Sequence, residues 1–240
     1  MKNFELISFA NADELAQAAA SEWLDEIVAA NRAAKPYCAA LSGGRIALKF
    51  FTEIASQAKT RAIPFGFVHF FWADERCVPP DDPESNFKMA RELLFAPLKI
   101  SDAQIHRIRG EDLPEVAVQK ANMEISNIAP LNSDGQPVLD LIFLGLGEDG
   151  HVASLFQNAT AEIANRSPFL FVPNSPKPPP NRISLNFQII AAAKKVWVLV
   201  SGKGKEIALK QSLGEKGRTP LAQVIESRLQ TRIFSDIHLD

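Results

Sequence analysis

The residues best suited to chemistry lie in a glycine-rich segment, where Asp149 and His151 stand two positions apart among Gly145, Gly147 and Gly150. An imidazole titrates near neutral pH and can act as a general base. A neighbouring carboxylate can orient the ring and stabilise its protonated form. In the other interpretation, Asp149 caps a following helix and His151 lies in its first turn. The spacing leaves both interpretations open.

The same three glycines satisfy the dinucleotide-binding spacing G-x-G-x-x-G. A Rossmann site places that motif early in a βαβ unit, with an acid about 20 residues further on to hold the ribose. Here the motif lies past the middle of the chain, and residues 163–205 contain no Asp or Glu. We therefore expect the glycines to form a tight strand-to-helix turn that aims Asp149 and His151 into a cleft.

A second glycine turn, Leu41-Ser-Gly-Gly-Arg45, ends an apolar run and precedes a helical pattern. The backbone N–H groups of such a turn and the positive end of the helix dipole form an anion site. The segment lacks the G-x-x-x-x-G-K-[ST] pattern, so it is not a P-loop. Ser42, Gly43, Gly44 and Arg45 are candidates for binding a phosphate or phosphosugar.

Charged residues also follow the apolar run that ends at Trp72, where Asp74, Glu75 and Arg76 stand together. An arginine can hold a phosphate or carboxylate through two parallel hydrogen bonds. Alternatively, Arg76 pairs with a carboxylate and fastens its own loop. Ser85-Asn86 begins the next helical pattern, either as a cap or with its hydroxyl and amide groups reaching the ligand.

Basic residues dominate the acid-free stretch. Arg182 follows the proline-rich loop 173–180, and Lys203 and Lys205 lie in a third strand-to-helix turn at 201–206. In a parallel sheet these turns open at the same edge, which indicates a phosphate-bearing substrate. We expect a solvated basic surface for most of the seven basic residues of the stretch: Arg166, Lys177, Arg182, Lys194, Lys195, Lys203 and Lys205.

Strand and helix patterns alternate along the chain, and the strands are nearly continuous apolar runs. This predicts an α/β fold with a doubly wound, mostly parallel sheet and helices on both faces, in one domain over residues 1–240. Strands are expected at 37–41, 65–72, 138–144, 169–172, 183–187, 196–200 and 232–234, and helices at 13–34, 46–58, 85–95, 205–213 and 221–227.

Composition excludes several functions. The net charge of -2 gives no reason to expect nucleic-acid or membrane binding, and no apolar run reaches the roughly 20 residues of a membrane span. Two cysteines, expected to be reduced thiols, indicate a cytoplasmic protein. No cluster has metal-ligand spacing and no G-x-S-x-G elbow occurs, which leaves a metal-free, non-covalent acid/base reaction. His69 is expected in the core, and His106 and His238 lack acidic or glycine-rich settings.

Four segments in this order resemble the 6-phosphogluconolactonase family. They are Leu41-Ser-Gly-Gly44, Trp72-x-Asp-Glu-Arg-x-Val-Pro79 with Ser85-Asn86, Leu144-Gly-Leu-Gly-Glu-Asp-Gly-His-Val-Ala-Ser-Leu-Phe156, and Arg182 with the turn 202–205. The resemblance implies hydrolysis of 6-phospho-D-glucono-1,5-lactone to 6-phosphogluconate without metal or organic cofactor. It also implies a fold shared with glucosamine-6-phosphate deaminases. The substrate is then a small sugar phosphate, and the protein a monomer or small homo-oligomer.

By this resemblance, His151 is the general base that activates water, and Asp149 orients the histidine or the water. The phosphate or the carbonyl oxygen is held by Arg76, Arg182 and Lys205. The same site would include Ser42, Gly43, Gly44, Asp74 and Asn86.

The chain departs from the family pattern at two places. The family usually continues Ser-Gly-Gly with Ser-Thr-Pro, where this chain has Arg45-Ile46-Ala47, so Arg45 would supply a charged contact in place of the hydroxyls. Gln157 stands where the family tends to have proline.

Two alternatives remain. A glucosamine-6-phosphate deaminase is expected to carry an acid shortly after the histidine loop, and residues 154–158 supply none. A non-catalytic sugar-phosphate sensor would be consistent with the altered 45–47 loop, but Arg76, Asp149 and His151 argue against it.

Overall fold

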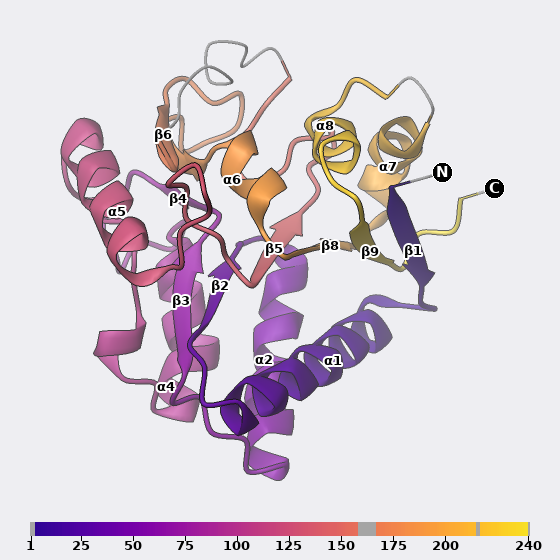
Figure 1. The fold of residues 1–240 in the computed structure, drawn as a ribbon. Helices are drawn as coiled ribbons and strands as arrows, with labels where there is room; N and C mark the ends of the chain where they lie inside the picture. The colour runs from indigo at the N-terminus through magenta and orange to yellow at the C-terminus, as the bar shows by residue number, and fades with distance from the viewer. Residues whose placement is uncertain (1–2, 158–166, 215–216, 240) are drawn as a thin grey trace.

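The computed structural model describes residues 3–157, 167–214 and 217–239. Its larger sheet has six strands in the order β1-β9-β8-β5-β2-β3, and every neighbouring pair is parallel (Figure 1). The predicted doubly wound, mostly parallel sheet is therefore confirmed. In that order the strands are Phe4–Ser8, Thr231–Ser235, Lys195–Val200, Leu141–Gly145, Tyr37–Leu41 and Val68–Trp72.

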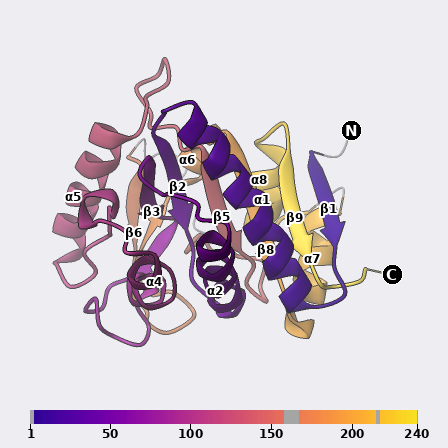
Figure 2. The same cartoon turned by 90° about the horizontal axis from the view of Figure 1, so that it is seen from below.

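Helices cover both faces of this sheet. Helices α1 (Ala12–Arg32) and α2 (Arg45–Thr60) lie on one face, and α6 (Phe187–Ala192), α7 (Glu206–Leu213) and α8 (Pro220–Glu226) lie on the other (Figures 1 and 2). The Trp23 ring of α1 packs edge-on against Phe143 of β5 with centroids 4.9 Å apart. Aromatic side chains thus fill the space between the helix layer and the sheet.

A second, antiparallel sheet was not predicted. It has the order β4-β7-β6, formed by Asp74–Arg76, Arg182–Leu185 and Phe169–Val172. Strand β4 has only three residues, all charged, so no apolar pattern marks it. Helix α5 (Pro114–Ile128), which lies beside this sheet in Figure 1, was also missed, as were β1 and α6.

Several predicted elements differ in detail. The strands expected at 65–72 and 138–144 are Val68–Trp72 and Leu141–Gly145. The helix expected at 85–95 is divided into α3 (Asn86–Ala90), a π-helical turn (Arg91–Phe95) and α4 (Ala96–Leu98). The strand expected at 183–187 ends at Leu185, because the Asn186 side chain accepts a hydrogen bond from Ile189 N–H and begins α6.

The helix expected directly after the turn at 145–150 is absent from residues 151–157. Residues 151–157 form turns and an isolated bridge between Val152 and Leu155, so no helix begins at His151. The interpretation in which Asp149 caps a helix that starts there is therefore wrong. Among the part of the chain that is described, no helix is long and apolar enough to cross a membrane. Cys38 and Cys77 are free thiols, as expected.

Candidate active site

A cavity of about 250 Å³ lies beyond the carboxyl ends of the parallel strands. Ten of the eleven predicted site residues line it, and the eleventh, Asp149, bonds to His151. The turns after β2, β5 and β8 therefore do meet at one edge of the sheet. The lining residues are Ser42, Gly43, Gly44, Arg45, Ile46, Asp74, Arg76, Asn86, Gly145, Leu146, Gly147, Glu148, His151, Ala153, Lys177, Arg182 and Lys205.

His151 and Asp149 form a hydrogen-bonded pair, with 2.5 Å between His151 Nδ1 and Asp149 Oδ1. An ionised carboxylate can only accept, so Nδ1 carries the hydrogen and Nε2 presents a lone pair. Among the described residues Nε2 has no hydrogen-bond partner, and the His151 ring packs against Phe156 with centroids 4.6 Å apart. The pair therefore has the orientation that a general base requires.

Burial lowers the pKa of His151 below its ordinary value, although the hydrogen bond and charge of Asp149 raise it. For Asp149, burial raises the pKa, but the hydrogen bond to His151 and the charges of His151 and Lys177 outweigh this and the net pKa is lowered. At neutral pH the carboxylate is thus ionised and the imidazole neutral. This is the protonation state in which Nε2 can accept a proton.

Glycines make room for this pair. A Cβ atom on Gly147 would lie 2.0 Å from His151 Nδ1 and 2.6 Å from Asp149 Oδ1, so any side chain there would displace both groups. The Gly147 N–H donates to the carbonyl of His151 at 2.9 Å and closes the loop. Gly150 has a φ of +83°, a conformation that favours glycine. The expectation that these glycines aim Asp149 and His151 into a cleft is met for His151, which lines the cavity; Asp149 does not line it but bonds to His151, and the expected helix does not follow.

The start of α2 forms a second wall of the cavity. Gly44 caps this helix with a φ of +100° and makes no side-chain capping bond. Arg45 and Ile46 of the first helical turn line the cavity, and no side chain caps their N–H groups, as in an anion site. Ser42 donates its hydroxyl to the Phe143 carbonyl at 2.8 Å, so the serine holds the loop against β5.

The small sheet supplies the third wall. Arg76 pairs with Arg182 and Asp74 with Ser184 across β4 and β7, and directly opposed residues share a face. Asp74 Oδ2 accepts a hydrogen bond of 2.6 Å from Ser154, and Arg182 Nη1 lies 3.4 Å from the same hydroxyl oxygen. An acid and two arginines are thus fixed side by side on one rigid surface.

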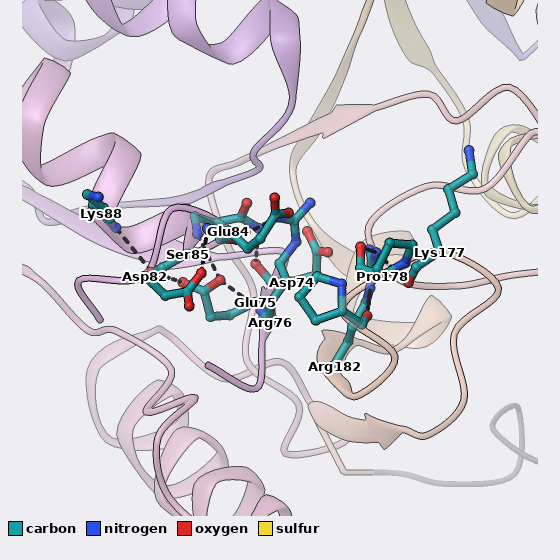
Figure 3. A network of polar contacts seen from close by, with 12 residues as sticks. Asp74, Glu75, Arg76, Asp82, Glu84, Ser85, Lys88, Lys177, Pro178 and Arg182 are labelled. Carbon is teal, nitrogen blue, oxygen red and sulfur yellow. Dashed lines mark hydrogen bonds and ion pairs between the residues drawn. The ribbon is translucent and has the colours of Figure 1, made fainter. Parts of the chain in front are cut away.

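Arg182 is almost fully buried, with 4% of its surface exposed. Its Nε donates to the Pro179 carbonyl, and its Nη2 donates to the carbonyls of Lys177 and Pro178 (Figure 3). Burial lowers the pKa of this guanidinium, opposed chiefly by the charge of Asp74. The proline-rich loop is therefore held by the same arginine that lines the cavity.

Arg76 combines the two roles that the sequence left open. Its Nη1 donates to the Glu84 carbonyl at 2.6 Å and lies 3.6 Å from the Glu84 carboxylate, while the side chain lines the cavity (Figure 3). Ser85 caps α3 by accepting from Lys88 N–H, and Asn86 donates to the Asp74 carbonyl. Of this pair only Asn86 lines the cavity.

Less buried cations lie around the remainder of the cavity. Burial lowers the pKa of Lys205, and the positive charge of Arg45 lowers it further. The Arg45 guanidinium lies 3.8 Å from the Glu148 carboxylate, and both side chains are exposed, so this ion pair is weak. Five basic side chains (Arg45, Arg76, Lys177, Arg182 and Lys205) thus line the cavity, with two acidic ones (Asp74 and Glu148). This excess of positive charge suits a dianion.

Three residues with polar or charged side chains, two lining the cavity and one supporting it, were missed as site residues; the other unpredicted lining residues are glycines or apolar residues. Lys177, expected on a solvated surface, lies 3.8 Å from Asp149. Glu148 lies near Arg45, and Ser154 bridges Asp74 and Arg182. The sequence did indicate them: Lys177 lies in the acid-free stretch, and Glu148 and Ser154 lie in the segment Gly-Glu-Asp-Gly-His-Val-Ala-Ser. Lys194 and Lys195 instead pair with Asp140 and Glu26, away from the cavity, and Arg166 lies outside the described residues.

Two of the other three histidines, His69 and His106, differ from their prediction. His69 is only partly buried, and its Nδ1 lies 2.9 Å from Nε2 of His106. His106 does have an acidic partner, because its Nδ1 lies 2.7 Å from the Glu124 carboxylate. Within the described ranges, no group of three or more His, Cys, Asp or Glu residues is arranged to hold a metal ion.

Comparisons with known proteins place this geometry in context. A family model described as glucosamine-6-phosphate isomerases/6-phosphogluconolactonase matches residues 10–233. The 6-phosphogluconolactonase of Mycobacterium tuberculosis is 35% identical over 212 residues, which cover 86% of this chain and 84% of that protein. That of Haemophilus influenzae is 35% identical over 196 residues, 82% of each chain. The crystal structure of the Thermotoga maritima 6-phosphogluconolactonase superposes with a TM-score of 0.79 at 27% identity, covering 97% of this chain and 98% of the other.

Proposed function

Because the chain belongs to the glucosamine-6-phosphate isomerase/6-phosphogluconolactonase family, we propose that it hydrolyses 6-phospho-D-glucono-1,5-lactone to 6-phosphogluconate. His151 acts as the general base and Asp149 orients it. The observation that supports this most is a hydrogen-bonded His–Asp pair in a cavity lined by five basic side chains. One end of such a site activates water and the other neutralises a phosphate.

In the proposed first step, Nε2 of His151 takes a proton from a water molecule as the water oxygen attacks the lactone carbonyl carbon. The carbonyl π bond opens and its electrons form an oxyanion. Asp149 stabilises the imidazolium that results through the bond at Nδ1. Cationic or N–H donors around the cavity stabilise the oxyanion, an effect typically worth about 2.7–4 kcal/mol per donor.

In the second step the oxyanion re-forms the carbonyl and the bond from the carbonyl carbon to the ring oxygen breaks. The ring oxygen receives the proton held by His151 and becomes a hydroxyl group, which restores the neutral imidazole. The product is a carboxylic acid, which ionises at neutral pH. No covalent enzyme intermediate is needed. The general base, its orienting carboxylate and the oxyanion donors are all groups of this chain.

The direct test is lactone hydrolysis by the purified protein, measured above the spontaneous rate. We expect strong acceleration with 6-phosphogluconolactone and weaker acceleration with unphosphorylated gluconolactone. Equal rates with and without the protein would exclude the catalytic proposal and leave the sugar-phosphate sensor. Equal rates for the two lactones would contradict the assignment of the basic side chains to phosphate.

Two neighbouring lysines provide a matched pair for the phosphate assignment. Lys205 lines the cavity, whereas Lys203, in the same turn, is exposed and does not. Lys205→Ala should raise the KM for the phosphorylated lactone by about tenfold or more, the effect of losing a hydrogen bond to a charged group. Lys203→Ala should leave that KM unchanged. Equal effects of the two substitutions would indicate only a general loss of positive charge.

A further inference from the structure

Glu75 lies on the far side of β4 from the cavity. Side chains alternate along a strand, so Asp74 and Arg76 face the cavity while Glu75 points toward the start of α3. Glu75 is 2% exposed, and the catalytic steps above do not use it. Burying a carboxylate costs free energy of folding unless the carboxylate is fully hydrogen-bonded, so its hydrogen-bond partners must be identified.

Four donors surround this carboxylate. Oε1 accepts from the N–H groups of Arg76 at 2.7 Å and Asn86 at 2.8 Å. Oε2 accepts from Phe87 N–H at 2.8 Å and from the Ser85 hydroxyl at 3.1 Å (Figure 3). One side chain therefore joins the end of β4 to the first turn of α3.

Two of those donors belong to residues that line the cavity, Arg76 and Asn86. The Asn86 side chain donates to the Asp74 carbonyl, and its buried Oδ1 has no partner among the described residues. A Cβ atom on Gly43 would lie 1.9 Å from that Oδ1, so Asn86 also packs directly against the loop before α2. Movement of the start of α3 would therefore disturb two walls of the cavity.

We propose that Glu75 is a positioning residue, whose carboxylate fixes Arg76 and Asn86 where they receive the substrate. This inference rests on the proposed lactonase function. Glu75 touches no reacting atom and acts through the two residues whose backbone it holds.

The charge on Glu75 is needed for this role. Its neighbours include the Asp74 carboxylate, the Cys77 thiol, the Arg76 backbone and, at longer range, the Arg107 guanidinium. Burial raises the pKa of Glu75 to about 7, although three backbone hydrogen bonds oppose the rise. A protonated carboxyl can donate to the Ser85 hydroxyl and still accept from the three backbone N–H groups, but hydrogen bonds to a neutral oxygen are about half as strong as those to an ionised one. Protonation should therefore loosen the start of α3.

The test compares Glu75→Gln with Glu75→Asp, with exposed Glu92→Gln as the control. Glu75→Gln puts an NH₂ group against N–H donors and should raise the KM for the phosphorylated lactone by about tenfold or more. Glu75→Asp keeps a carboxylate and should recover part of this loss. Glu92→Gln should behave as the wild type. Wild-type KM and kcat in folded Glu75→Gln would overturn the proposal.

A second measurement does not depend on activity. The amide NMR signals of Arg76, Asn86 and Phe87 in the wild type should titrate together between about pH 5.5 and about pH 8.5, as expected for a carboxyl with a raised pKa. Their common midpoint should coincide with a rise in KM on the acidic side. Signals that titrate with different midpoints would mean that Glu75 does not hold these amides as one unit, and this result would overturn the proposal even if Glu75→Gln does not fold. An inactive wild type with the titration present would instead refute only the lactonase function.

Discussion

Two histidines in this chain bond a carboxylate through Nδ1, and their surroundings differ. His151 lies 2.5 Å from Asp149 in the cavity, whereas His106 lies 2.7 Å from Glu124 beside α5. The Nε2 atom of His106 is occupied by His69 at 2.9 Å, while that of His151 has no partner among the described residues. An acidic partner at Nδ1 therefore does not by itself identify a general base. The histidine must also have an Nε2 atom that can accept a proton.

One cation of the cavity also differs from two cations near His106. Around His106, Arg107 is paired with Glu111 and Lys120 with Asp112. In the cavity of His151, Lys205 forms no ion pair within the described residues, and its pKa is lowered by burial and by Arg45. Positive charge that is not neutralised internally is available for an anionic ligand. The comparison separates a structural histidine from a chemically usable one.

The largest effect should come from removing each imidazole in turn. His151→Ala should lower kcat for lactone hydrolysis by about 10²–10⁴-fold, the usual contribution of a general base. His106→Ala should leave kcat within a few-fold and lower the thermal stability, because it leaves His69 and Glu124 without a partner. Steady-state rates with the spontaneous rate subtracted, together with a melting curve, check both. Comparable losses of kcat would remove the distinction between the two histidines.

The next largest effect should come from filling the space beside His151 that Gly147 leaves open. Gly147→Ala places a methyl group where the His151 and Asp149 side chains meet, so kcat should fall by at least about tenfold, as expected when a catalytic group is misplaced. Gly66→Ala is the control, because its Cβ would meet nothing within 4 Å. A Gly147→Ala protein with wild-type kcat would mean that the geometry of the pair is not needed.

The smallest effect is a displacement of the pH profile. The hydrogen bond and charge of Asp149 raise the His151 pKa, so Asp149→Asn should lower that pKa further. Activity requires neutral His151 and is lost as pH falls through its pKa. The acidic limb of log kcat, which the effect of Glu75 on KM does not enter, should therefore move to lower pH, with a reduced maximum. Glu124→Gln should not move the limb. A shift of the limb to higher pH in Asp149→Asn would contradict the assignment of the limb to His151.

Local patterns explain most of what was predicted correctly. The strand Tyr37–Leu41 was predicted with its observed bounds, because a short apolar run followed by Ser-Gly-Gly is recognisable within a few residues. The three turns after β2, β5 and β8 were found for the same reason. The small strand β4 could not be found in this way, because its three charged residues become a strand only by pairing with β7, about a hundred residues later in the chain.

The sequence by itself determined the local parts of the site: the two-residue spacing of Asp149 and His151, the glycines around them, and the order of the segments. These depend on neighbours in the chain. The tertiary structure alone decided that Lys177 lines the cavity, that Lys194 and Lys195 do not, and that Nε2 of His106 is bonded to His69. The physical reason is that the register of the strands and the antiparallel pairing of β4 with β7 bring distant residues together, which no local spacing specifies.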